Sequence, residues 1–148
     1  MAILGLAAIS DSRRFLIPNI YPLGLLLLGT IAWFVGFPFV APLWSHLLHF
    51  AVALGVGMLL FHLGWFGGGD VKLYAAVAFW FGFSNGFSLL FVISICGVAI
   101  VALSILLRLL RTAFGSGDRE KGSFMKRRIA YGLAIAAGGI FSLFWVYP

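Results

Sequence analysis

Charged residues are scarce in this sequence, and acidic residues are the scarcest. Charged side chains make up 9% of the 148 residues and hydrophobic ones 63%, whereas about 25% of a soluble domain is charged. Too few polar side chains are present to cover the apolar surface of a soluble protein of this size. The composition therefore excludes a soluble globular domain and a disordered chain, and it predicts a polytopic membrane protein.

Cysteine is almost absent as well, because Cys96 is the single one. One cysteine makes no internal disulfide, and no Cys-x-x-Cys pair exists to hold a zinc ion. A disulfide scaffold and a zinc-ribbon-like site are both excluded. We expect Cys96 to act as a small hydrophobic residue inside an apolar run.

Basic residues are concentrated in one segment. The net charge is +6, and seven of the ten Lys and Arg residues lie between Arg108 and Arg128. The positive-inside rule favours a cytoplasmic loop that meets anionic lipid headgroups. We therefore expect the lipid bilayer, and no nucleic acid, to be the partner of this segment.

Apolar stretches separated by breaks predict an all-α bundle with about six transmembrane segments, forming a single domain over residues 1–148. The expected segments are Met1–Ser10, Ile20–Phe37, Leu43–Trp65, Val71–Phe83, Phe87–Arg108 and Ile129–Tyr147. The first is short, because a helix of about ten residues reaches about half of a hydrocarbon core roughly 30 Å thick. Either it is a half-spanning helix, or the natural start lies further upstream.

Charge also predicts the orientation of these segments. Arg13, Arg14 and the basic segment are expected on the cytoplasmic side, and two hairpins separate them. The turns at Pro38–Pro42 and Ser84–Gly86 carry no Lys or Arg, as outside turns should. The polar break Asp11–Asn19 and the glycine-rich loop Phe66–Asp70 then both face the cytoplasm.

Two of the four acidic residues are candidates for chemistry. Asp118 and Glu120 lie among basic residues and are expected to be solvated, whereas Asp11 and Asp70 each end an apolar segment on the same side. For either carboxylate alone, a role as a helix cap and a functional role in the membrane are equally good explanations. Placed close together, the two share one proton. The ionised one can then activate a water, while the protonated one hydrogen-bonds a scissile carbonyl.

The residues around Asp70 fit this aspartic-protease chemistry, which requires no metal and no cofactor. Gly67, Gly68 and Gly69 would let an extended substrate backbone approach without Cβ clashes, although a flexible turn explains them equally well. Lys72 is two residues further on and so does not share a helical face with Asp70. We expect it to extend towards the membrane interface rather than to tune the carboxylates.

Histidines offer a rival site, which we consider weaker. His46 and His49 are three residues apart on one helix, but no acid or cysteine on that helix completes a metal shell, and His62 lies about 20 Å from His49. Interhelical hydrogen bonds or interfacial positions are the better prediction. Ser45 is adjacent to His46 and does not face it, so no nucleophile is expected there.

Three runs of sequence resemble type IV prepilin peptidases. The run from Asp11 through Pro18 to Asn19 resembles the family's aspartate-to-Ile-Pro-Asn signature, and Gly67–Leu73 resembles its Gly-x-Gly-Asp-x-Lys signature. The run from Ile129 to Gly138 resembles the last helix of the family, in which Tyr-Gly precedes small residues. Together they cover nearly the whole chain in the right order.

The resemblance implies an aspartyl endopeptidase of the bacterial cytoplasmic membrane. Such enzymes remove the basic leader of prepilin-like proteins at the cytoplasmic face, with Asp11 and Asp70 as the catalytic pair and no cofactor. The supporting motif positions are Gly67, Gly68, Gly69, Lys72, Pro18 and Asn19. Larger members of the family carry an additional region with two Cys-x-x-Cys pairs, and they also methylate the product. This sequence contains no such pairs, so we expect a peptidase with no methyltransferase activity. It most resembles the branch of the family that processes Flp-type pilins.

Two other classes of function remain open at this point. A small transporter or channel subunit could use Asp11, Asp70 and Lys72 as a relay, and a non-catalytic subunit could serve assembly of a pilus or secretion complex. Replacing either aspartate with the isosteric Asn distinguishes the peptidase from these two alternatives. Only a peptidase is expected to stop forming a cleaved product while the variant protein remains inserted in the membrane. The oligomeric state is not predicted.

Overall fold

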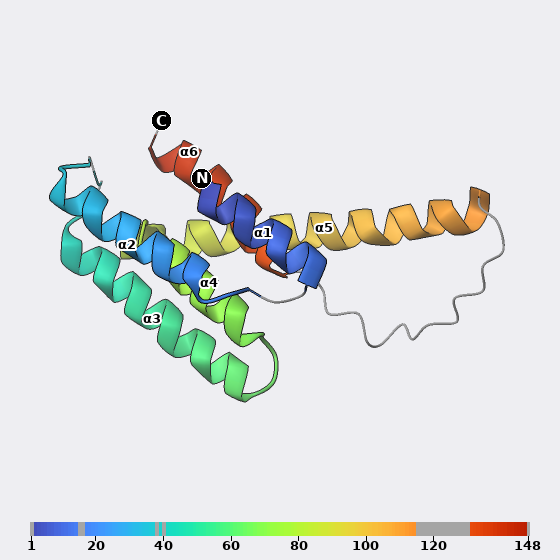
Figure 1. Ribbon diagram of the computed structural model, residues 1–148, viewed down its shortest axis with the longest axis horizontal. Coiled ribbons are helices and arrows are strands. Elements are labelled where there is room, and N and C mark those ends of the chain that lie inside the picture. The colour runs from blue at the N-terminus through green and yellow to red at the C-terminus, as the bar shows by residue number, and fades with distance from the viewer. Residues whose placement is uncertain (1, 15–16, 38, 40, 115–130, 148) are drawn as a thin grey trace.

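The computed structural model describes residues 2–14, 17–37, 39, 41–114 and 131–147, and this part of the chain folds into helices without any strand (Figure 1). The elements are α1 (Ala2–Arg14), α2 (Ile20–Phe34), α3 (Leu43–His62), α4 (Gly68–Ala78), the 3-10 helix η1 (Phe83–Asn85), α5 (Gly86–Phe114) and α6 (Tyr131–Val146). The all-α helical bundle predicted from the sequence is confirmed, including its short first helix of 13 residues.

The short helix α4 lies at the centre of the bundle, where α2, α3 and α6 all pack against it. Glycines lie at these contacts: Gly57 of α3 and Gly139 of α6 face α4 itself, and Gly29 of α2 faces Phe79 and Trp80 directly after it. A Cβ at Gly57, for instance, would lie 2.6 Å from Cγ1 of Val71. Small residues of this kind allow helix backbones to approach closely, which fixes the position of α4 and of whatever it carries.

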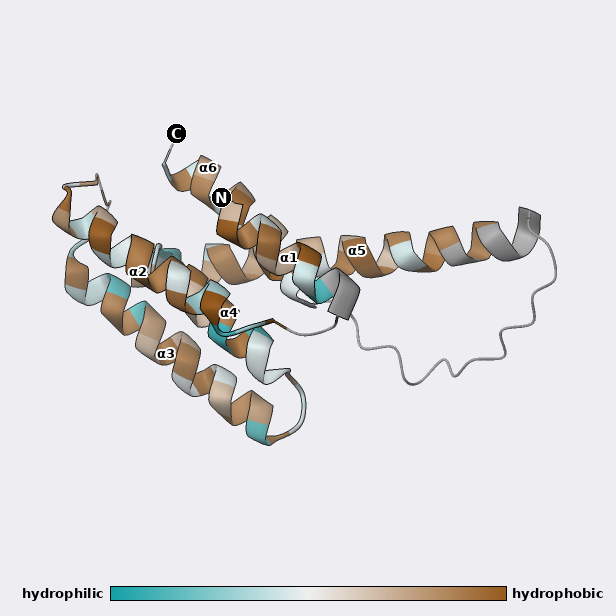
Figure 2. Ribbon diagram, in the orientation of Figure 1, coloured by the Kyte–Doolittle hydropathy of each residue, from teal (hydrophilic) through white to brown (hydrophobic). Residues whose placement is uncertain are grey.

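The helices are mostly apolar, as the brown ribbon in Figure 2 shows, and many of their large apolar side chains are exposed. Two described helical segments, Leu43–His62 and Phe83–Leu107, are long and apolar enough to cross a membrane. Helix α5 packs along α6 and then continues well beyond the rest of the bundle (Figure 1). Exposed apolar surface of this extent is far larger than an ordinary soluble protein presents.

Several segment boundaries differ from the sequence prediction: α2, α3 and α4 end earlier than predicted, at Phe34, His62 and Ala78. Helix α1 continues to Arg14, so Asp11 lies inside a helix rather than in a polar break. Helix α4 begins at Gly68, so the predicted loop before Asp70 is shorter, because the Asp70 carboxylate accepts a hydrogen bond from the Gly67 N–H and stabilises the first turn. Helix α5 includes Arg108 and ends at Phe114, while the rest of the predicted basic loop, residues 115–130, lies outside the described part of the chain.

Polar side chains of α3 hold the chain where α4 ends. The Nδ1 atoms of His46 and His49 each lie 3.0 Å from a carbonyl oxygen, that of Phe79 and Phe81 respectively. The hydroxyl of Ser45 accepts a hydrogen bond of 2.8 Å from the Phe83 N–H. The predicted interhelical role of these two histidines is confirmed, and Ser45 serves the backbone.

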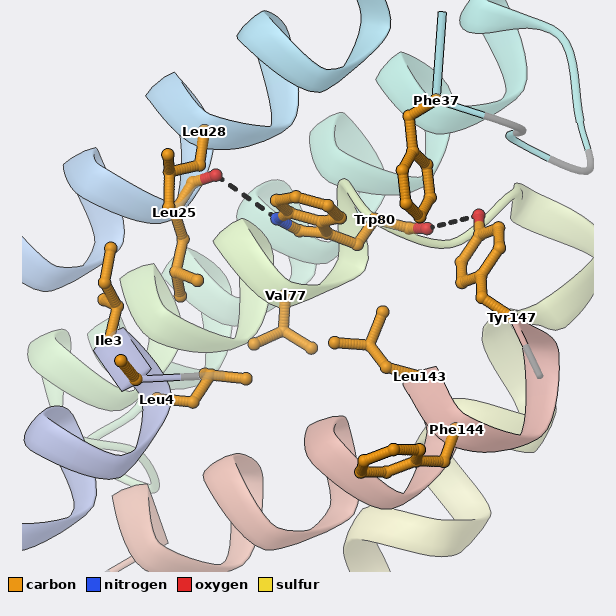
Figure 3. A pocket seen from close by; sticks show the side chains of 11 residues that line it. Ile3, Leu4, Leu25, Leu28, Phe37, Val77, Trp80, Leu143, Phe144 and Tyr147 are labelled. Atoms are coloured by element: carbon orange, nitrogen blue, oxygen red, sulfur yellow. Dashed lines mark hydrogen bonds between the residues drawn. The ribbon is translucent and has the colours of Figure 1, made fainter.

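An apolar cavity of about 390 Å³ opens between the start of α1, the end of α6, α2 and α4 (Figure 3). Two hydrogen bonds frame it, from Trp80 Nε1 to the Leu25 carbonyl at 3.2 Å and from the Tyr147 hydroxyl to the Trp80 carbonyl at 2.9 Å. The carboxyl end of α4 lines this cavity, whereas Asp70 lies at the amino end of the same helix. The cavity and the acidic residues therefore occupy opposite ends of the bundle.

We expect the substitution His49→Ala to lower the free energy of unfolding by about 1–2 kcal/mol, because it leaves the buried Phe81 carbonyl without its donor. Denaturant titration in detergent micelles measures the change. The control is His62→Ala, since His62 is exposed at the end of α3 and its loss is expected to leave stability unchanged. An equal loss in both variants would contradict the assigned role of His49.

Candidate active site

Asp11 is buried, with 5% of its surface exposed, and it faces the first turn of α6. The Gly132 N–H donates to its Oδ2 atom at 2.8 Å, and the Leu133 N–H also hydrogen-bonds the carboxylate. Amides in the first turn of a helix have no partner within their own helix. A side chain of α1 therefore completes the hydrogen bonding of α6, and α6 in return holds the carboxylate.

The contact with Asp11 requires glycine at position 132, because there is no room for a side chain. A Cβ at this position would lie 2.7 Å from the Asp11 Oδ2 atom and 2.7 Å from Cδ1 of Ile17. In the sequence, Gly132 lies in a run of small residues, which is typical of close helix packing. That explanation fits Gly139, which faces Val77, but it does not reveal the contact of Gly132 with Asp11. The Tyr-Gly pair in the resemblance to the family's last helix was the available signal.

Asp70 lies in the first turn of α4 and is partly buried. The Gly67 N–H hydrogen-bonds its carboxylate, and a Cβ at Gly67 would lie 2.6 Å from its Oδ2 atom. Gly67 has extended backbone angles, φ −77° and ψ 140°, that any residue can adopt. The need for glycine at this position is therefore steric, and it comes from the carboxylate of Asp70 itself.

Ile17 connects the two carboxylate environments. Its side chain lies against Gly132, and a Cβ at Gly69 would lie 3.1 Å from the Ile17 Cβ and 3.4 Å from its carbonyl oxygen. Ile17 thus packs between the residue that binds Asp11 and the residue that precedes Asp70. The end of α1, the start of α4 and the start of α6 meet around this side chain.

The electrostatics of Asp70 reflect this arrangement. Burial, followed by the nearby charge of Asp11, raises the pKa of Asp70 from 3.8 to about 6, and the hydrogen bond from Gly67 opposes the shift. Two carboxyl groups that influence each other in this way titrate as a pair, and this pair keeps one proton up to about pH 6. Such a pair can supply a base and an acid at the same time.

A second link joins the two sequence motifs. The Nζ atom of Lys72 donates to the Oδ1 atom of Asn19 at 3.1 Å, and both side chains are exposed. The Tyr21 N–H donates to the Pro18 carbonyl at 3.2 Å as α2 begins. Lys72 was expected to extend towards the membrane interface; its side chain is exposed, and its bond to Asn19 also ties the start of α2 to α4.

The predicted site residues thus gather at one end of the bundle, around Asp11 and Asp70. Asp118 and Glu120 lie outside the described residues. Where the chain is described, no group of three or more His, Cys, Asp or Glu side chains could hold a metal ion. Two of the histidines, His46 and His49, bind carbonyls beyond the opposite end of α4.

These features define a class of protein: an apolar helical bundle that brings two acidic residues together at one end. A model of the type IV leader peptidase family matches residues 1–102, which include both aspartates and end within α5. The chain belongs to this family, whose members are membrane-embedded, and membership implies protease activity. No curated protein and no solved structure matches the chain.

The raised pKa of Asp70 predicts how stability depends on pH. The pKa of Asp70 is about 6 in the folded protein and roughly 4 in the unfolded chain. Asp70 therefore contributes its full stability below about pH 4, and this contribution is lost as the pH rises through about 6. We expect Asp70→Asn to be more stable than the native protein at pH 7, and the difference to shrink towards pH 4. Chemical unfolding in detergent across this range measures it; a stability gap that is constant with pH would contradict the prediction.

Proposed function

We propose that this protein is a membrane-embedded aspartyl endopeptidase that removes the leader peptide of prepilin-like proteins at the cytoplasmic face of the membrane. The observation that carries the proposal is the meeting of Asp11 and Asp70, the two acidic residues of the described chain, at one end of the bundle. Membership of the leader peptidase family supports the reaction class.

The proposed reaction uses the pair with one proton between them. The ionised carboxylate takes a proton from a water molecule, whose oxygen attacks the scissile carbonyl carbon, while the protonated carboxyl donates to the carbonyl oxygen. The resulting gem-diol then collapses. One carboxyl gives its proton to the leaving nitrogen as the C–N bond breaks, and the other takes a proton from the diol. The pair returns to its starting state without a covalent intermediate.

The position of the site supports cleavage at the cytoplasmic surface. Asp11 follows the apolar residues of α1 and lies just before Arg13 and Arg14 in the sequence, and basic residues next to apolar segments favour the cytoplasmic side. Asp70 lies at the start of its helix, directly before the apolar run that begins at Val71. A leader peptide that emerges from the bilayer on that side would meet both carboxylates.

The surrounding motif residues are assigned to positioning. Gly67 and Gly69 give room to the Asp70 carboxylate and to Ile17, and the bond between Lys72 and Asn19 joins the segments that follow the two aspartates. Small displacements of reacting groups reduce rates strongly, by about 100-fold for a shift of roughly 1 Å. Residues that fix the two carboxylates therefore belong to the working site even without contacting substrate.

The first prediction of this proposal concerns the two carboxylates. Co-expressed with a prepilin from the same genome, the native protein is expected to shorten the pilin on a gel, and neither Asp11→Asn nor Asp70→Asn is expected to do so. Both variants should remain inserted at native levels, which membrane fractionation checks. Cleavage by both Asn variants would make the aspartates structural and favour an assembly subunit, whereas ion transport with no cleaved product would favour a transporter.

A second prediction tests the glycine before Asp70. Gly67→Ala places a Cβ 2.6 Å from Oδ2 of Asp70, so the carboxylate must move, and we expect cleavage to slow by about 10- to 100-fold. Gly55→Ala is the matched control, because no atom lies within 4 Å of a Cβ at Gly55 in α3. Initial rates at equal enzyme amounts give the comparison, and equal rates for the two variants would remove Gly67 from the site.

A further inference from the structure

The two carboxylates are held in different ways. Asp11 is 5% exposed and accepts hydrogen bonds from two amides of another helix, those of Gly132 and Leu133. Asp70 is more exposed and is hydrogen-bonded by one amide, that of Gly67, which is the residue that caps its own helix. The pair is therefore asymmetric before any substrate arrives.

We propose that Gly132 is a positioning residue whose amide, together with the first turn of α6, keeps Asp11 as the ionised member of the pair, so that Asp11 is the base and Asp70 carries the shared proton. This inference rests on the proposed function and assigns the two roles that a symmetric pair leaves open. It also gives α6, which lies outside the segment matched by the family model, a part in the chemistry.

The physical basis is the preference of amide donors for a charged acceptor. Burial raises the pKa of Asp11, and the hydrogen bonds from Gly132 and Leu133 oppose that shift. An N–H group binds an ionised carboxylate more strongly than a neutral carboxyl, so two such donors favour the ionised form. The first turn of a helix adds its positive end, which acts in the same direction. Gly132 allows this contact because any side chain at the position would occupy the space of the Asp11 Oδ2 atom.

Few other charges face Asp11 among the described side chains. Helix α4 presents Asp70 and Lys72, and the Lys72 ammonium is hydrogen-bonded to Asn19. Tyrosines are the other titratable groups on the packed helices: Tyr21 in α2, Tyr74 in α4, and Tyr131 at the start of α6, whose side chain is outside the described set. The side chains of Arg13 and Arg14, on the same helix as Asp11, are outside the described set. The amides of α6 are therefore the closest identified groups that favour the charge of Asp11.

The assignment fixes the direction of each proton transfer. Asp11 takes the proton from water as the oxygen–carbon bond forms, while Asp70 gives its proton to the carbonyl oxygen. Asp11 then delivers its proton to the leaving nitrogen as the C–N bond breaks, and Asp70 recovers one from the diol. The cycle ends with Asp11 ionised and Asp70 protonated, as it began.

The test titrates each carboxyl alone, without using activity. In Asp11→Asn the remaining member of the pair is Asp70, and in Asp70→Asn it is Asp11. The infrared carbonyl band of a protonated carboxyl, followed against pH in detergent, gives each midpoint after subtraction of the spectrum of the double Asn variant, which retains Asp118 and Glu120. We expect the midpoint in Asp11→Asn to be higher than that in Asp70→Asn. Equal midpoints, or the reverse order, would overturn the assignment whether or not the protein cleaves prepilins.

A second comparison tests Gly132 itself. In the Asp70→Asn background, Gly132→Ala is expected to raise the midpoint of Asp11 by about one pH unit or more, the value of a lost hydrogen bond to a charged group. Gly139→Ala in the same background is the matched control, because it adds a Cβ to the same helix against Val77. Equal midpoints in the two variants would refute the role of Gly132; if Gly132→Ala does not fold, the order of the midpoints in the single Asn variants decides the assignment.

Discussion

The hydrogen bond between the Gly132 N–H and the Asp11 carboxylate is the interaction on which the acidic end of this bundle depends. A carboxylate that is 95% buried is unstable in its charged form unless donors replace the lost water. The start of α6 supplies those donors at the point where its amides have no partners of their own. One contact thus satisfies a buried side chain and a helix terminus, and it requires glycine at position 132.

The position of Asp70 depends on a different kind of constraint. Its helix, α4, is packed on several sides by α2, α3 and α6, and glycines at these contacts leave little freedom for it to shift. The raised pKa of Asp70 disfavours folding above about pH 6, so the carboxylate lowers stability where the enzyme is expected to work. The close packing of α4, and the bonds from His46 and His49 beyond its far end, offset this local destabilisation.

Much of this arrangement was predictable from the sequence, because the signals are local. Apolar runs and breaks predicted the order of the helices, and the positions of Asp11 and Asp70 at the ends of such runs singled them out. The contacts that complete the site were not predictable in this way. Gly132 lies 121 residues from Asp11, and Lys72 lies 53 residues from Asn19, so no spacing rule relates them. The extension of α1 past Asp11 was missed because a short polar run after an apolar one is typical of a break.

The two ends of the bundle differ in the groups that they bring together. At one end, amides at the starts of α6 and α4 bind the carboxylates of Asp11 and Asp70. At the other end, aromatic and aliphatic side chains line an apolar cavity, and Trp80 and Tyr147 use their polar atoms on backbone carbonyls. Each end of the bundle thus has its own chemistry: backbone amides bind the two acids at one end, and aromatic side chains donate to backbone carbonyls at the other.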